Sequence, residues 1–516
     1  MSKLSPLISF FRLSANGLQL PFIILCLITL SRSQEAFSQA GNFTEKNGIT
    51  FSPRWLNNLV ILNNMREGEL APEKQMLYIW AETALAGQEN DSYAALINYH
   101  GLQSHCEENN IRHLGGPMLG NISENSVDVW LRTVKPDTVT VKVKIDGQHK
   151  TFGPVYTSAA SELSGVVRVT GLQPGTSYPY QVLVGDQPIQ IQENALIRTI
   201  PAQDDKITRI AFGSCFHRWG LGNMQQTNTI LSRQPHAFMG LGDIAAQDKM
   251  DNMGWHSLDY LARDLYPAWQ KLVAEVPFYA LWDDHDYFGN DMAGTPRGFA
   301  PEDKEKVWQV FRHAWANPAY GFGEDNAKGV FFRTRIGAAD LIVIDHRYFR
   351  TDNSFLGQQQ MQWLEKQLLE CKGPFIILAG GTMWSDYVSR GKDSWGRTDP
   401  EAREKILSLI EKHQIPGVLL ISGDRHGSRG FTIPRPSGFK FYEFEVASLG
   451  GLAGPPASRP EWEENQLYGI SGGYAFGEFT FDTQPKDPTV TFRLIGEDGN
   501  FIHEMTLKRS ELTPGR

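Results

Sequence analysis

Six short, largely apolar segments of the chain each stop at residues able to bind metal ions or phosphate. These segments are residues 207–212, 237–241, 278–282, 341–344, 375–379 and 418–421. Apolar runs of this length, bounded by Gly and polar residues, are typical of strands buried on both faces. Helical patterns lie between several of them, at residues 301–312, 358–368 and 400–410. The alternation predicts an α/β catalytic domain over residues 207–510, built on a mostly parallel sheet covered by helices.

The flanking regions show other patterns. Residues 116–200 alternate between apolar and polar positions over short segments separated by Gly, Pro and Asp, which predicts a small all-β sandwich domain. Residues 172–184 resemble the turn and strand of a fibronectin-type module. Residues 41–115 are helical or irregular, with the clearest helical spacing after Glu73. Near the C-terminus, residues 470–510 return to strand patterns, which we expect to complete the catalytic sheets.

The first forty residues are typical of an export signal. Lys3 and Arg12 precede an apolar core over residues 20–30, which is too short to span a membrane. Small residues before Gly41 fit a cleavage site. We therefore predict that residues 1–40 are a signal peptide and that the protein is exported, to the periplasm, the cell surface or the medium. The alternative is an uncut N-terminal anchor. No other segment is long and apolar enough to be a transmembrane segment.

Length, charge and cysteine content narrow the possibilities further. A chain of 516 residues is too long for one hydrophobic core. The net charge of −9 argues against nucleic-acid recognition, although a bound metal would still attract a small anionic substrate. Cys106, Cys215 and Cys371 follow the signal, so at least one thiol stays unpaired. Cys215, at the end of a predicted buried strand, is the candidate ligand, and the sequence leaves open whether Cys106 and Cys371 pair.

Four residues at strand ends have the chemistry of a metal site. Such sites form beyond the carboxyl ends of strands in open α/β sheets. The thiolate of Cys215 suits zinc or iron, and the two oxygens of Asp243 can bridge two cations. Asp424 and His426 stand two residues apart, so both side chains point the same way from an extended chain. Each residue alone has a plain structural explanation, but together they predict a binuclear metal site.

The densest polar cluster of the chain is residues 282–291, which contain four aspartates, a histidine and an asparagine. Carboxylates crowded in this way repel one another unless cations offset their charge. Asn290 offers a neutral carbonyl oxygen to a hard cation. Asp284, His285 and Asp291 have the chemistry of ligands, of a general acid or of groups that orient ligands, and the sequence does not separate these roles.

Arg347 follows another of the predicted strands. Its guanidinium matches the geometry of a phosphoryl group, which makes it a candidate for stabilising charge during phosphoryl transfer. The structural alternative is an ion pair with Asp345, two residues earlier. The sequence favours neither.

These motifs, in this order, resemble those of the PhoD-type alkaline phosphatases, which are phosphodiesterases of the calcineurin-like metallophosphoesterase superfamily. The matching motifs are Gly-Ser-Cys215, Leu-Gly-Asp243, Trp282-Asp-Asp-His-Asp-Tyr with Asn290-Asp291, Asp345-x-Arg347 and Ser-Gly-Asp424-x-His426. The resemblance covers roughly residues 115–510. It implies a metallophosphoesterase β-sandwich flanked by helices and preceded by a small β-domain. It also implies a centre of two metal ions, iron and calcium, and hydrolysis of phosphate diesters and often monoesters outside the cytoplasm.

The resemblance also implies a set of ligands. Cys215, Asp243 and His426 would hold the iron, and Asp243, Asn290 and Asp424 would hold the calcium. One position departs from the family pattern, because Ala246 stands where a tyrosine often coordinates the iron. Without a tyrosinate, Fe(II), Zn or Mn becomes an alternative to ferric iron.

We therefore expect an exported binuclear-metal phosphohydrolase, in which hydroxide activated by the metals attacks the phosphorus of a small or polymeric phosphate ester. Arg347 would stabilise the developing charge, and His285 or Asp284 would protonate the leaving group. One alternative is a phosphodiesterase directed at phospholipid or a teichoic-acid-like polymer. Another is a non-catalytic surface or binding protein on a degenerate phosphatase scaffold, an idea motivated by Ala246.

Overall fold

The computed structural model describes residues 45–46, 49–50, 70–85, 92–191, 195–202, 207–245, 248, 252–323, 328–388 and 394–515. The chain divides into two compact units, Met1–Trp55 and Leu56–Arg516. In the first unit, β1 (Glu45–Lys46) pairs with β2 (Ile49–Thr50) in antiparallel fashion. The predicted signal peptide and Ala246 lie outside the described residues.

The second unit begins with helices and two antiparallel sheets. The helices are α3 (Pro72–Leu85), η1 (Tyr93–Asn98) and α4 (His100–Glu108). The strands, with one short helix among them, are β3 (His113–Gly120), β4 (Ser126–Thr133), β5 (Thr138–Ile145), β6 (Gln148–Tyr156), η2 (Ala159–Ser161), β7 (Ser164–Thr170), β8 (Ser177–Val184), β9 (Gln187–Pro188) and β10 (Leu196–Arg198). One sheet has the order β3-β4-β7, and the other has the order β10-β8-β5-β6 with β9 on β8. Inward positions of β5 alternate with outward ones, as the sequence pattern predicts.

These N-terminal sheets contact the helices that follow them. Strand β3 packs against α7 (Met253–Leu265) and α8 (Pro267–Val273). At the same junction the hydroxyl of Tyr180 donates a 2.8 Å hydrogen bond to the carbonyl oxygen of Ala274, and Arg198 pairs with Glu275 at 2.8 Å. Both contacts are at least partly buried, so the two regions pack as parts of one compact unit.

All six predicted strands are present. They are β11 (Ile207–Gly213), β12 (Ala237–Leu241), β13 (Phe278–Leu281), β15 (Ala339–Val343), β16 (Phe375–Ala379) and β17 (Val418–Ser422). The prediction of one mostly parallel sheet is wrong, because the strands are divided between two mixed sheets. The order of the first is β13-β12-β11-β21-β22-β23, and that of the second is β14-β15-β16-β17-β19-β18-β20. An antiparallel strand covers the outer side of β11 and of β15, so neither can pair with the other.

The remaining strands complete these two sheets, as expected for residues 470–510. They are β14 (Phe332–Ile336), β18 (Gly427–Pro434), β19 (Lys440–Ala447), β20 (Gln466–Ile470), β21 (Ala475–Asp482), β22 (Thr489–Gly496) and β23 (Phe501–Lys508). The sheets pack face to face through aromatic rings. The centroid of Phe444 in the second sheet lies 4.4 Å from that of Phe492 in the first, and Phe375 lies 5.0 Å from Phe481. The sandwich of the predicted α/β fold class is thus confirmed.

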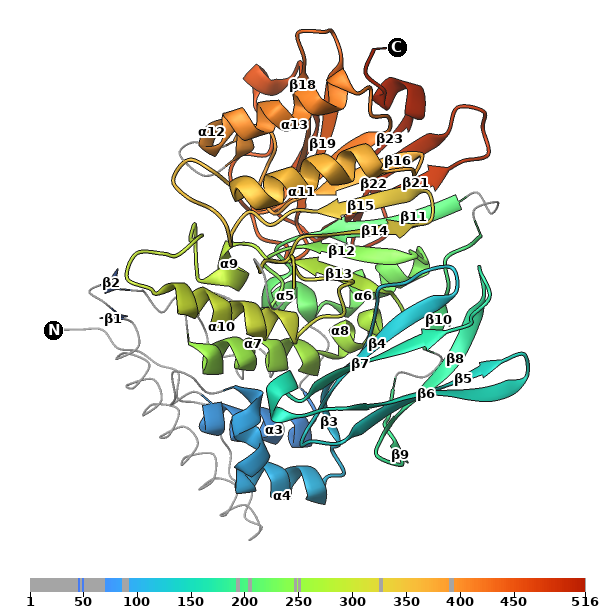
Figure 1. The fold of residues 1–516 in the computed structure, drawn as a ribbon, viewed down its shortest axis with the longest axis vertical. Coiled ribbons are helices and arrows are strands. Elements are labelled where there is room, and N and C mark those ends of the chain that lie inside the picture. The colour runs from blue at the N-terminus through green and yellow to red at the C-terminus, as the bar shows by residue number, and fades with distance from the viewer. Residues whose placement is uncertain are drawn as a thin grey trace, which may run out of the picture. The chain divides into compact units, whose positions relative to one another are not determined.

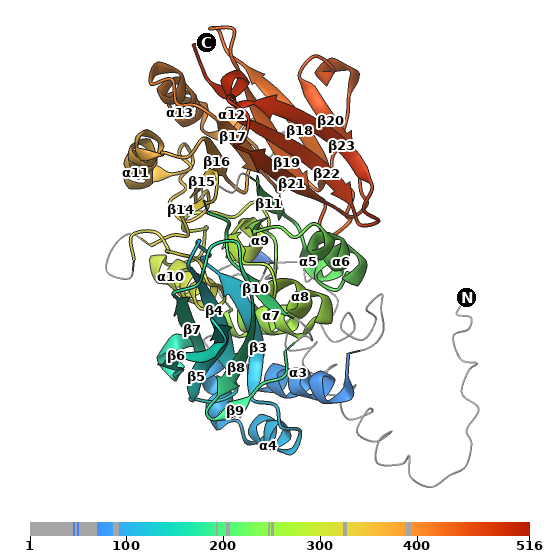
Figure 2. The same cartoon turned by 90° about the vertical axis from the view of Figure 1, so that its right-hand side faces the viewer.

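Helices flank parts of the sandwich (Figures 1 and 2). Beyond α7 and α8 they are α5 (His217–Leu221), α6 (Met224–Ser232), α9 (Asp284–Tyr287), α10 (Pro301–Arg312), α11 (Gly357–Glu370), α12 (Trp395–Thr398), α13 (Pro400–Lys412), η3 (Pro460–Trp462) and η4 (Arg509–Leu512). Helices α11 and α13 lie side by side against β15, β16 and β17 (Figures 1 and 2). Alternate residues of β16 face them: Ile376 and Leu378 join the helix-side core, and Phe375 and Ile377 join the core between the sheets. Burial on both faces explains the continuous apolar runs.

Two further sequence expectations concern membranes and disulfides. Within the part of the chain that the structure describes, no helix has the length and apolar character needed to cross a bilayer. Cys106, Cys215 and Cys371 are all free thiols, so the pairing of Cys106 with Cys371 that the sequence left open is not formed.

Candidate metal centre

The carboxyl ends of the parallel strands in the two sheets approach each other closely. Ser214, just after β11, donates its backbone N–H to the carbonyl oxygen of Val446 in the other sheet at 2.8 Å. A Cβ atom on Gly423, after β17, would clash with the side chain of Ser214. A Cβ on Gly381, after β16, would lie 2.8 Å from the carboxyl carbon of Asp283. Only glycine permits this approach, and it brings polar strand ends from both sheets into one region.

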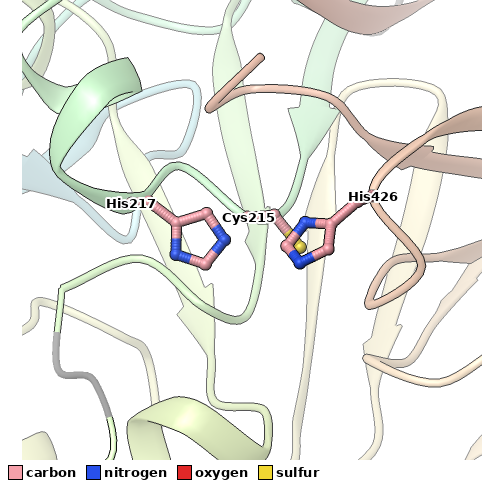
Figure 3. A group of neighbouring side chains, drawn as sticks. All are labelled: Cys215, His217 and His426. Atoms are coloured by element: carbon pink, nitrogen blue, oxygen red, sulfur yellow. The ribbon is translucent and has the colours of Figure 1, made fainter. Parts of the chain in front are cut away.

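One group of donors at this junction consists of Cys215, His217 and His426. The sulfur and one nitrogen of each ring all lie within 4.8 Å of one another. Figure 3 shows the three side chains pointing toward one another, with His217 at the start of α5 and His426 in the loop after β17. Two atoms bound to one zinc ion at about 2.0–2.3 Å are at most about 4.6 Å apart, so the spacing is close to that of a metal site.

Carboxylates form two further groups beside the first. Asp243, Asp284 and His285 meet the same 4.8 Å criterion, as do Asp283, Asp284 and Asp424. Asp284 belongs to both groups, so they are continuous.

A short contact joins the carboxylates to the sulfur group. The Cys215 sulfur lies 3.4 Å from Oδ2 of Asp243 and 3.8 Å from the carbonyl oxygen of Asp424. The structure thus brings together six of the eight predicted site residues: Cys215, Asp243, Asp284, His285, Asp424 and His426.

The loops that carry these donors have unusual backbone conformations. Five of the eight residues in the three groups have positive φ angles: Cys215, His217, Asp243, Asp424 and His426, between 46° and 77°. Each such residue costs on the order of 1–3 kcal/mol, which the surrounding structure has to offset. Strain of this kind gathers at functional sites.

Asp286 fixes the loop that carries Asp243. Its carboxylate accepts backbone N–H bonds from Asp243 at 2.5 Å, Ile244 at 3.1 Å and Ala245 at 3.4 Å. It also accepts the N–H of Asp283 at 3.1 Å. Burial raises the pKa of Asp286 to about 6, against the opposing effect of these bonds. The aspartates of segment 282–291 therefore have different roles, and that of Asp286 is to position the loop that carries Asp243.

The buried carboxylates need a positive partner. Burial raises the pKa values of Asp243 and Asp283 well above the usual range, and neighbouring carboxylates add to this effect. Three buried atoms, Oδ1 of Asp243, Oδ2 of Asp283 and Nδ1 of His426, have no hydrogen-bond partner among the described residues. Leaving such atoms unsatisfied is costly. Cations bound here would satisfy all three and favour ionised carboxylates, so the donor set fits metal ions.

The three histidines of the site differ in charge. Burial lowers the pKa of His426 to about 4 and that of His217 well below its usual value, so both rings are neutral, as a metal ligand requires. Burial also lowers the pKa of His285, but the carboxylates of Asp284, Asp243 and Asp248 outweigh burial and raise it well above its usual value. The Nδ1 atom of His285 lies 2.7 Å from Oδ1 of Asp248.

Asn290 lies on the loop after α9, at the edge of these groups. Its side chain is exposed and donates a 2.8 Å hydrogen bond to Asp291. Its backbone N–H donates to Oδ1 of Asp248, the oxygen that also contacts His285. The backbone N–H of Asp291 donates to Oδ2 of Asp284 at 2.6 Å. This loop is therefore tied to the site through Asp248 and Asp284.

Arg347 is completely buried and forms an ion pair with Asp283. Its Nε and Nη2 atoms both lie 2.5 Å from Oδ1 of Asp283, and Asp284 is 3.8 Å from Nη2. Asp345 instead accepts the indole N–H of Trp282 at 2.8 Å and backbone N–H groups, including that of Arg347. The ion pairs that the structure describes for Arg347 are thus with Asp283 and Asp284.

Two residues of the site were missed by sequence reasoning. Asp283 is one of the four aspartates in residues 282–291, and its spacing did not distinguish it from the other three. His217 was missed although its signal was available: Cys215-x-His217 has the same spacing as Asp424-x-His426, and both follow a buried strand.

Two family models match parts of the chain. Residues 258–492 match the family model of the PhoD-like phosphatases. The chain carries a PhoD-like phosphatase domain. Residues 111–201 match a second family model, that of a domain of unknown function, DUF7800. No curated protein matches the chain in sequence. The resemblance inferred from the motifs is thus confirmed, and the domain is that of a phosphohydrolase from a metal-dependent family.

A solved structure shows the same fold. A structure of PhoD superposes with a TM-score of 0.63 at 17% identity, covering 78% of this chain and 91% of the other. Two further structures match less closely. GAP50, the anchor in the inner membrane complex of Plasmodium, gives a TM-score of 0.37 at 15% identity, covering 59% and 90%. The protein TT1561 of Thermus thermophilus gives 0.26 at 14% identity, covering 48% and 92%.

Proposed function

We propose that the protein is an exported phosphohydrolase that uses two metal ions to cleave phosphate diesters, monoesters or both. The observation that carries this proposal is the buried set of thiol, imidazole and carboxylate donors at the junction of the two sheets. Its unpaired buried atoms are the kind that bound cations would satisfy. Export is motivated by the N-terminal sequence pattern alone.

The proposed ligands combine the groups of donors with the ligand set that the family resemblance implies. Cys215, Asp243 and His426 would hold one ion, since the sulfur and an oxygen of Asp243 are 3.4 Å apart. Asp243, Asp424 and Asn290 would hold the second, with Asp243 between the two ions. Such a pair of ions lowers the pKa of water and offsets charge on phosphoryl oxygens.

His285 is the residue we propose as proton donor to the leaving oxygen. Asp248 holds its Nδ1 atom, which fixes the orientation of the ring. The carboxylates of Asp284, Asp243 and Asp248 raise its pKa, and Asp248, which is not a proposed ligand, would still favour the protonated form that a general acid requires when the ions are bound. Asp284 has a different role in this proposal, because its two oxygens accept backbone N–H bonds from His285 at 3.0 Å and Asp291 at 2.6 Å. We propose that it orients His285 and adds negative charge beside the ions.

Arg347 acts through the carboxylates in this proposal. Because its side chain is fully buried and pairs with Asp283 and Asp284, it offsets their charge and holds them in place. We therefore propose that Arg347 stabilises the carboxylates of Asp283 and Asp284, and not the charge on a phosphoryl oxygen as the sequence predicted.

The test is hydrolysis of bis-p-nitrophenyl phosphate and p-nitrophenyl phosphate by the purified protein, with and without a chelator. We expect chelator-sensitive cleavage that falls at least about 100-fold in Asp243→Asn. The control is Asp186→Asn, an exposed aspartate in a hairpin turn outside the site. Full activity of Asp243→Asn would disprove the bridging role. Absence of cleavage and of bound metal, from folded protein, would favour the binding-protein alternative.

A further inference from the structure

We propose that His217 is a direct ligand of the ion held by Cys215, Asp243 and His426. In this chain it replaces the tyrosine donor that is absent at Ala246. The inference rests on the proposed function, since it extends the metal site of that function by one ligand.

The backbone directs His217 into the site. Its N–H donates to the carbonyl oxygen of Asp243 at 3.3 Å, and its φ of 46° is the left-handed conformation also found at Cys215, Asp243 and His426. Cys215 and His217 are therefore two donors on one short strained turn, as Asp424 and His426 are on the opposite turn. Two turns of the same design, one from each sheet, face each other.

The side chains also converge. The rings of His217 and His426 have centroids 5.2 Å apart and are tilted by 42°, so they do not stack. One nitrogen of each lies within 4.8 Å of the Cys215 sulfur (Figure 3). One ion placed among these three donor atoms would therefore bind both rings and the sulfur.

The resulting donor set favours a divalent ion. One thiolate, one carboxylate and two neutral imidazoles carry two negative charges, which balance a divalent ion. Thiolate and imidazole are the ligands that zinc favours in proteins, and ferrous iron accepts the same donors. A tyrosinate would add a third negative charge and favour ferric iron. Replacing it by His217 therefore shifts the site toward a divalent ion.

X-ray absorption spectroscopy of the full chain loaded with zinc tests the assignment. We expect one sulfur and two imidazoles around zinc in the wild type. His217→Ala should keep the sulfur, lose one imidazole, and bind zinc more than about 100-fold more weakly in competition with a chromophoric chelator. The control is Trp219→Phe, which alters an exposed ring on the same helix and removes no donor for zinc.

The wild-type spectrum decides the question even if His217→Ala fails to fold. One imidazole in the wild type, or two in His217→Ala, would overturn the assignment of His217. If chelator-sensitive hydrolysis is retained in those cases, only this inference fails and the proposed function stands. If the wild type binds no metal and hydrolyses no ester, both fail. Tighter binding of ferric iron than of zinc would overturn the divalent preference.

Discussion

Asp286 shows how a residue that holds no ion can define the site. Four backbone N–H groups converge on its carboxylate, and two of them belong to Asp243 and Asp283. An ionised carboxylate accepts from all four, whereas an amide presents a donor face to some of them. The position of Asp243 therefore depends on Asp286 more than on the conformational preference of its own residue type.

Asp286→Asn tests this dependence. We expect hydrolysis of p-nitrophenyl phosphate to fall at least about 10-fold, because the loop of Asp243 shifts. The free energy of unfolding, measured by urea titration, should fall by about 2–3 kcal/mol, since charged hydrogen bonds are lost. Unchanged activity with reduced stability would show that the loop keeps its shape without the carboxylate.

At the scale of residues, the sequence predicted which side chains can bind a metal better than it predicted which side chains contact each other. Cys215 and Asp424 were found because a polar residue after a buried strand is conspicuous. The partner of Arg347 was not predicted. The neighbouring Asp345 accepts backbone N–H groups of its own turn, and the actual partner, Asp283, follows a different strand. Which carboxylate meets a guanidinium is decided by tertiary packing, which local spacing does not encode.

At the scale of elements, apolar runs predicted the strands but not their sheet. Strands β11 and β15 have similar patterns, yet they lie in different sheets. Strand β21, from near the C-terminus, pairs with β11, and β14, the strand just before β15, pairs with β15. Periodicity reports how many faces of a strand are buried and carries no information on its neighbour. The division into two sheets therefore required the structure.

Gly423→Ala probes the approach of the two sheets. The added methyl group would meet the side chain of Ser214 and has no free space to occupy. We expect a loss of about 1–3 kcal/mol in the free energy of unfolding, together with weaker metal binding. In the double variant with Ser214→Gly, part of the loss in stability should be recovered. A strictly additive double-mutant cycle would argue against direct contact.

The turn before β12 should make folding sensitive to acid. Nδ1 of His236 accepts the backbone N–H of Arg209 at 3.0 Å, which requires an unprotonated nitrogen. Burial lowers the pKa of His236 from 6.5 to about 4, and Arg209 adds to the effect. The unfolded state thus binds the proton more tightly, so stability is fully present above pH 6.5 and is lost as pH falls toward 4.

His236→Asn removes this titration and keeps an acceptor near the same place. Urea titrations at several pH values between about 7.5 and 4.5 should show a smaller loss of stability in the variant than in the wild type. The difference should be about 1–3 kcal/mol, reduced by the partial exposure of the ring. Parallel curves for the two proteins would exclude His236 as a source of the acid sensitivity.

At the scale of the whole molecule, bound ions should stabilise the fold. The donors come from both sheets, so unfolding separates them and only the native chain binds tightly. Ligand at 1,000 times its dissociation constant adds about 4 kcal/mol. We therefore expect a chelator to lower the Tm in differential scanning fluorimetry. The shift should shrink in Asp243→Asn, and an equal shift in that variant would place the stabilising ion elsewhere.

The pairing of donors across the sheets also sets an order of events during folding. In sequence, 209 residues separate Cys215 from Asp424, and their loops meet only after both sheets have formed and docked. Contacts of such long sequence separation form late. Metal binding therefore requires that folding is complete. A nascent chain that ends at β16 contains the thiol and several carboxylates but lacks the turn that carries Asp424 and His426. Metal uptake would therefore show that both sheets have formed and docked.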